Sequence, residues 1–67
     1  MDREQLKQLI LQSLEHERGG VKVYETAVEA AVNDDLREEW TEYLEQTRRH
    51  VQILEGVCKK FEIDPEE

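Results

Sequence analysis

Apolar residues recur at helical spacing along almost the whole chain, and one short polar stretch interrupts them. The interruption is Asn33-Asp34-Asp35, and the only proline is Pro65. A chain of 67 residues with this pattern is expected to form one all-α domain, a hairpin with helices at about residues 3–32 and 36–62 and a turn at 33–35. In the first helix the apolar positions are Leu6, Leu9, Ile10, Leu14, Val21, Tyr24, Val28, Ala31 and Val32.

Both expected helices carry start signals. Asp2 with Gln5 forms a capping box, in which each side chain bonds an otherwise unpaired amide, and Asp35 with Glu38 repeats the pattern. Asn33 tolerates the left-handed conformation that often follows a helix end. A tight reversal between the two helices is therefore predicted.

The second helix has an apolar face of three columns. This width suits a bundle better than a two-stranded coil, so a second hairpin is expected to cover it and give a four-helix bundle. The segment Ile63-Asp64-Pro65 is predicted to end the helix, because proline disfavours helical geometry in the residue before it. The seam is Trp40, Leu44, Thr47, Val51, Leu54, Cys58 and Phe61, and its flank is Leu36, Tyr43, His50 and Val57.

Charge and cysteine content exclude several classes of function. Seventeen acidic and nine basic residues give a formal net charge of −8, which repels nucleic acid and anionic lipid and attracts cations. The single cysteine, Cys58, cannot form an intrachain disulfide and is expected to be a small buried hydrophobe. No apolar run is long enough for a signal peptide or a membrane span, so a cytoplasmic protein is expected.

Glu17 lies near the centre of the apolar stripe of the first helix. An ionised carboxylate in a dry core costs several kcal/mol unless a cation or hydrogen bonds compensate. With the reversal centred near Asp34, Glu17 is level with His50 on the second helix, and Thr47 lies one helical step from His50. Carboxylate and imidazole are both ligands for zinc, iron or manganese. A two-fold dimer would bring two such pairs together.

These residues carry a resemblance to a known group. The central glutamate, the short acidic turn and the segment "EYLEQTRRHVQILEGV" resemble the ferritin-like superfamily, in particular its short two-helix members such as the encapsulated ferritins and small stress-related proteins. The resemblance implies a homo-oligomer, either a dimer of hairpins or a larger assembly, that binds iron and handles or oxidises it. It also implies that Glu17 and His50 are ligands. Thr47 stands where these families place a second glutamate, so one hairpin supplies an incomplete Glu-x-x-His pair.

Four further side chains are weaker candidates for the site, among them Thr47 as a ligand. His16 lies at the other edge of the stripe, and Tyr24 and Tyr43 could donate hydrogen bonds around the ligands. Two glycines follow closely: Gly19 costs helix stability, and Gly20 either allows close helix approach or leaves space beside Glu17.

Two alternatives stay open. One is a helical dimerisation or interaction module without metal, in which Glu17 pairs with Arg48 or Arg49. The other is the N-terminal half of a longer ferritin-like protein, whose next hairpin would complete the site.

Overall fold

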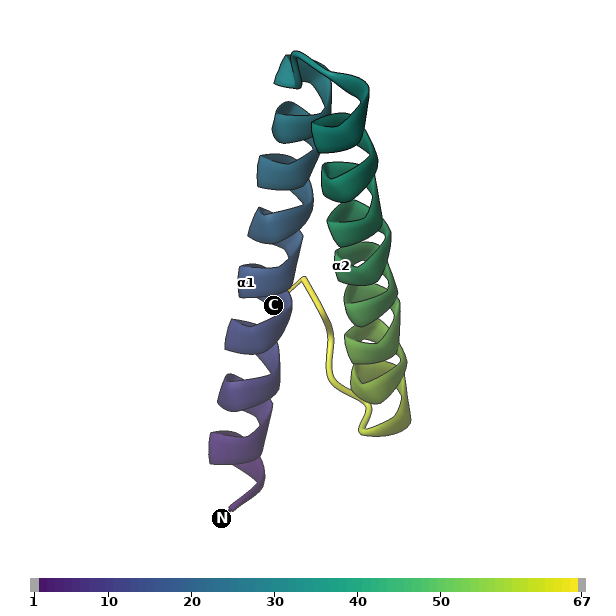
Figure 1. Cartoon of the computed structure of the whole chain (residues 1–67). Helices are drawn as coiled ribbons and strands as arrows, with labels where there is room; N and C mark the ends of the chain where they lie inside the picture. Colours follow the sequence, from purple (N-terminus) through teal and green to yellow (C-terminus); the bar gives the residue numbers. More distant parts are fainter. Residues whose placement is uncertain (1, 67) are drawn as a thin grey trace.

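The chain folds into a helical hairpin. The computed structural model describes residues 2–66, and within them α1 spans Arg3–Ala30 and α2 spans Asp34–Lys60, with no strand (Figure 1). The molecule measures 47 × 19 × 15 Å. The predicted all-α hairpin is confirmed. Neither helix, over the described residues, is long and apolar enough to cross a membrane.

The start of α1 is the capping box that the sequence predicts. The Gln5 amide donates to Asp2 Oδ1 at 2.8 Å, and the Asp2 amide donates to Gln5 Oε1 at 3.4 Å. Two of the unpaired amides of the first turn are thereby satisfied.

The turn differs from the prediction in detail. Asn33 has an extended backbone (φ −138°, ψ 164°) rather than a left-handed one, and its side chain caps α2 by accepting from the Leu36 amide at 2.8 Å. The predicted cap at Asp35 with Glu38 is therefore wrong: Asp34 and Asp35 lie inside the first turn of α2. Asparagine is as good a cap as aspartate, and two carboxylates in the first turn complement the helix dipole.

The end of α2 also comes earlier than predicted. The helix stops at Lys60, and Glu62 takes the left-handed conformation at φ 57°. The Ile63 amide donates to the Cys58 carbonyl at 2.8 Å and the Glu62 amide to the Lys59 carbonyl at 3.2 Å. This is a Schellman motif, so the backbone turns back three residues before Pro65. Phe61 caps the helix and is 38% exposed instead of continuing the seam.

The C-terminal tail, residues 61–66, runs back along the hairpin towards the middle of α1 (Figure 1). Ile63 joins the core, packing with Ile10, Leu14 and Cys58, of which Cys58 is fully buried as predicted. Arg18 fastens the rest of the tail through an ion pair to Glu66 at 3.1 Å and a hydrogen bond to the Pro65 carbonyl at 3.5 Å.

Ion pairs join the two helices on one side of the hairpin, which we call the tail face. The tail face consists of Arg18, Glu25, Arg48 and Glu55 together with residues 61–66. Arg18 pairs with Glu55 at 3.0 Å and Arg48 with Glu25 at 3.2 Å, so both contacts join α1 to α2. The hydrogen bond to Glu55 and the charge of Glu66 raise the pKa of Arg18 above its ordinary value.

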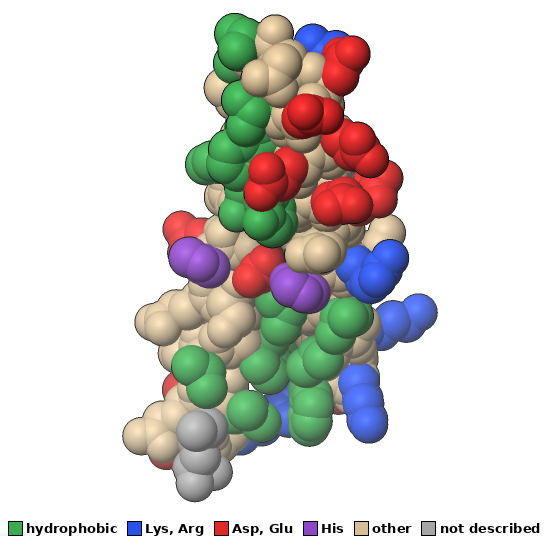
Figure 2. Space-filling view, viewed as in Figure 1, with side chains coloured by type: hydrophobic (Ala, Val, Ile, Leu, Met, Phe, Trp, Pro, Cys, Tyr) green, Lys and Arg blue, Asp and Glu red, His purple; other side chains and the backbone are tan. Residues whose placement is uncertain are grey.

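The opposite side, which we call the open face, has a different character. Its residues are Leu9, His16, Glu17 and Val23 on α1 and Tyr43, His50 and Ile53 on α2. His16 and His50 each lie two residues, about 200° of helix rotation, from Arg18 and Arg48 of the tail face. The apolar members stay accessible: Leu9 is 50% exposed, Val23 64% and Ile53 58%. Figure 2 shows hydrophobic side chains above and below a middle band that holds both histidines.

Candidate metal centre

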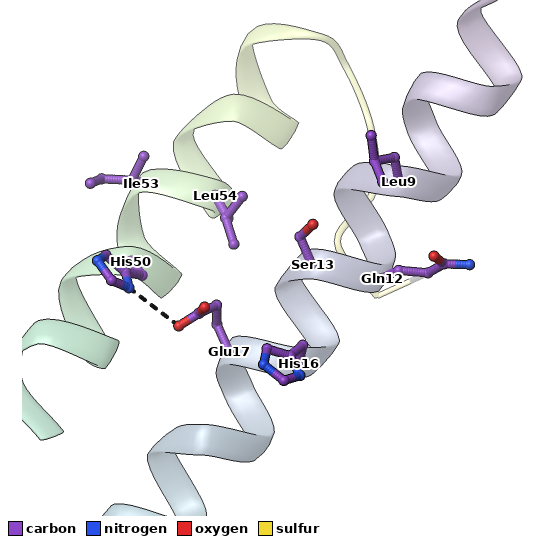
Figure 3. A pocket seen from close by; sticks show the side chains of 8 residues that line it. All are labelled: Leu9, Gln12, Ser13, His16, Glu17, His50, Ile53 and Leu54. Carbon is purple, nitrogen blue, oxygen red and sulfur yellow. Dashed lines mark hydrogen bonds and ion pairs between the residues drawn. The ribbon is translucent and has the colours of Figure 1, made fainter. Parts of the chain in front are cut away.

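A groove in the middle of the open face brings the two principal candidates together. Glu17 Oε2 lies 3.4 Å from His50 Nδ1, and the two side chains point toward each other from α1 and α2 (Figure 3). The expectation that these residues share one depth in the hairpin is confirmed. It follows from simple geometry, since antiparallel helices place residues equally distant from the turn side by side.

The two side chains differ in their contact with solvent. Glu17 is 27% exposed and His50 is 58% exposed, so the carboxylate is the more enclosed of the pair. If His50 carries its proton on Nδ1, it donates to Glu17, and its other ring nitrogen keeps a lone pair for a cation. The same carboxylate would then orient the imidazole.

The separation also fits both groups as ligands of one ion. Two ligands bound at about 2.0–2.2 Å in tetrahedral geometry stand roughly 3.3–3.5 Å apart. The observed 3.4 Å between Glu17 Oε2 and His50 Nδ1 lies in this range. Both atoms could bind one ion only in the tautomer in which Nδ1 carries the lone pair instead of the proton.

His16 lies on the edge of the same groove. It is exposed, and Figure 3 shows it beside Glu17 on α1, across the groove from His50. Even so, within residues 2–66 no three His, Cys, Asp or Glu side chains are grouped closely enough to hold a metal ion. One hairpin thus offers two neighbouring donors and a third side chain nearby, fewer than the four ligands of a typical structural metal site.

Thr47 borders the turn side of the groove, but its hydroxyl is bonded within α2. Its hydroxyl donates to the Tyr43 carbonyl at 2.8 Å, and the residue is only 8% exposed. A β-carbon built on Gly20 would lie 3.2 Å from Thr47 Cγ2. Gly20 therefore allows the helices to approach closely at this level. Of the two explanations that the sequence leaves open, this contact supports close approach.

The two tyrosines form an aromatic cluster with Trp40 on the turn side of the groove. The ring centroids are 5.8–5.9 Å apart. Tyr24 and Tyr43 both border the groove that Glu17 and His50 share, but the Tyr43 hydroxyl donates to Glu39 at 3.4 Å. Tyr43 therefore directs its hydrogen bond away from the candidate ligands.

Two polar residues that line the groove were not predicted from the sequence to belong to the site. Ser13 and Gln12 lie beside Glu17 on α1, between Leu9 and His16 (Figure 3). Ser13 is four residues before Glu17, a spacing that places both on one side of a helix and could have drawn attention to it.

The alternative pairing of Glu17 with Arg48 or Arg49 is not found among the described residues, because Glu17 contacts His50 and Arg48 meets Glu25 on the tail face. No family model, curated protein or solved structure matches the chain. What the chain does must be inferred from its own residues.

Proposed function

We propose that this chain is a metal-binding protein of ferritin-like character, in which Glu17 and His50 are ligands and a second hairpin completes the site. The observation that carries the proposal is the approach of a half-buried carboxylate and an imidazole to 3.4 Å in the groove. The net charge of −8 supports it by drawing cations to the molecule.

Iron is the first candidate for the metal, with zinc and manganese as alternatives, because a mixed carboxylate and imidazole set suits all three. Iron would supply ferroxidase-type redox chemistry, the activity that the resemblance implies. The residues of the chain have a simpler task. Glu17 and His50 hold the ion, and Leu9, Ile53 and Leu54 line the groove beside them.

Metal binding is tested by anaerobic titration with Fe²⁺ and, separately, with Zn²⁺ in a calorimeter. Glu17→Gln and His50→Gln should each weaken binding by about tenfold or more, because each removes a ligand or the group that orients it. Glu29→Gln removes one exposed carboxylate of α1 outside the groove and is the matched control. Equal affinities for the wild type and both groove variants would refute the site.

A metal-free interaction module is the second candidate. It is favoured by the absence, within the described residues, of any group of three donor side chains. In that case Glu17 and His50 satisfy each other, and Glu17→Leu should stabilise the protein. The melting temperature with and without chelator separates the two. A metal present at 100 times its dissociation constant stabilises by about 2.7 kcal/mol, on the order of 10 °C for a small domain, whereas the module should show no change.

A further inference from the structure

The C-terminal tail has one buried anchor. Among residues 61–66, Ile63 alone is buried, at 6% exposed, and the other side chains are partly or fully accessible to solvent. Ile63 packs with Ile10 and Leu14 of α1 and with Cys58 of α2. In Figure 1 the two helices stand farther apart at this end than at the turn, and the tail runs back between them. A single apolar side chain therefore carries most of the burial that holds the tail in place.

The ionic anchor of the tail lies close to solvent. Arg18 pairs with Glu66 at 3.1 Å, and the two side chains are 33% and 74% exposed. The same guanidinium pairs with Glu55 of α2, so one side chain connects the tail to both helices. Ion pairs this accessible contribute little to stability and weaken as salt is added. The ionic anchor is therefore weak and depends on ionic strength.

The backbone at the base of the tail is strained. Glu62 has the left-handed conformation at φ 57°, which is unfavourable for a residue with a β-carbon. This conformation lets the Ile63 amide donate to the Cys58 carbonyl at 2.8 Å and directs the tail back along the hairpin. If Ile63 leaves the core, Glu62 can return to a relaxed backbone. Strain at Glu62 therefore favours release of the tail, whereas burial of Ile63 opposes it.

Chain entropy also favours release, because every residue held in one backbone conformation loses freedom. One buried side chain and an exposed ion pair are few contacts for a segment of this length, and such segments open at lower free energy than the core. The helices have further contacts that do not involve the tail. Nearer the turn, Arg48 pairs with Glu25, and the Tyr24 ring lies 5.9 Å from the Trp40 ring.

We propose that residues 61–66 form a strap that opens as a unit while α1 and α2 stay folded, and that the Arg18–Glu66 ion pair helps to hold it closed. Opening withdraws Ile63 from the core and uncovers Cys58, which is fully buried in the closed state. Because salt weakens the ion pair, the strap opens more often as ionic strength rises. The strap does not depend on the proposed metal site, whose ligands lie on the open face.

Labelling of Cys58 with excess N-ethylmaleimide tests the opening. The chain has one cysteine, so every adduct found by mass spectrometry of the full chain reports one position. The reagent is neutral, so salt does not change its attraction to the acidic protein. Labelling through the open strap should change little up to about 1 M urea, because a local opening exposes little new surface.

Two variants separate the strap from the rest of the tail face. Glu66→Gln removes the ion pair with Arg18 and should speed labelling by about two- to fivefold at low ionic strength. Glu25→Gln is the matched control, since it removes the ion pair with Arg48 on the same face and leaves the tail contacts intact. It should label at the wild-type rate. Added salt should bring the wild-type rate towards that of Glu66→Gln.

Urea denaturation of the three proteins at the same concentration gives their global stabilities for comparison. A labelling rate that is insensitive to low urea and rises in Glu66→Gln but not in Glu25→Gln supports the strap. A rate that climbs steeply with urea and follows the global stability of each protein would overturn it, because the thiol would then be uncovered only by unfolding. Equal rates for the wild type and Glu66→Gln would overturn the role of the Arg18–Glu66 pair.

Discussion

Glu17 shows how the position of a single side chain in the sequence can point to a site. A carboxylate on an apolar helix stripe needs compensation, and counting residues from the turn identifies His50 as the group opposite it. The sequence did not reveal the roles of its neighbours in the same way. Thr47 could be read as a replacement for a ligand, yet its hydroxyl bonds the Tyr43 carbonyl four residues back. Such local backbone bonds leave no periodic signal.

The adjacent glycines differ in what surrounds them, and this gives a prediction. A β-carbon at Gly19 would meet nothing within 4 Å, whereas one at Gly20 would lie 3.2 Å from Thr47 Cγ2. Gly19→Ala should therefore stabilise the hairpin by about 0.5–1 kcal/mol through reduced entropy of the unfolded chain, and Gly20→Ala should gain less.

Urea denaturation at fixed protein concentration measures both changes. The control is Gly20→Ala in a Thr47→Ser background, which removes Cγ2 and keeps the hydroxyl. In the Thr47→Ser background, Gly20→Ala should stabilise the protein as much as Gly19→Ala does. If Gly20→Ala is as stabilising as Gly19→Ala in a chain that keeps Thr47, the close helix approach is refuted.

Among the helix boundaries, the start of α1 was the most predictable. The capping box at Asp2 involves only residues close together in the sequence, so the sequence predicts it directly. Residues 33–35 offered two good caps for α2, and sequence alone could not choose Asn33 over Asp35. The end of α2 lacked its usual signal, because glutamate, not glycine, holds the left-handed position at residue 62.

That glutamate gives a second prediction. A residue other than glycine in the left-handed region costs about 1–2 kcal/mol, partly offset by the lower chain entropy of the unfolded state. Glu62→Gly should therefore stabilise the protein by about 0.5–1 kcal/mol, raising the melting temperature by a few degrees. Lys60→Gly, two residues earlier and still helical, should destabilise it by a similar amount. A lower melting temperature for Glu62→Gly would contradict the Schellman geometry.

At the scale of the whole molecule, the periodicity of apolar residues predicted the hairpin but not which side of it the C-terminal tail would cover. The tail face depends on contacts between residues far apart in sequence, such as Arg18 with Glu55 and Glu66, and no local pattern encodes them. The side left accessible is the one on which the sequence had already placed Glu17 and His50.

The fastened tail has a consequence for how far association can go. Because Arg18 and Ile63 hold residues 61–66 against one side of the hairpin, that side is covered, and Leu9, Val23 and Ile53 stay exposed on the open face. A face that meets its own copy is used up when two molecules associate, whereas two different interaction sides would let each addition expose another and extend a fibre. A tail fixed in this place would therefore limit any self-association through the open face to a pair.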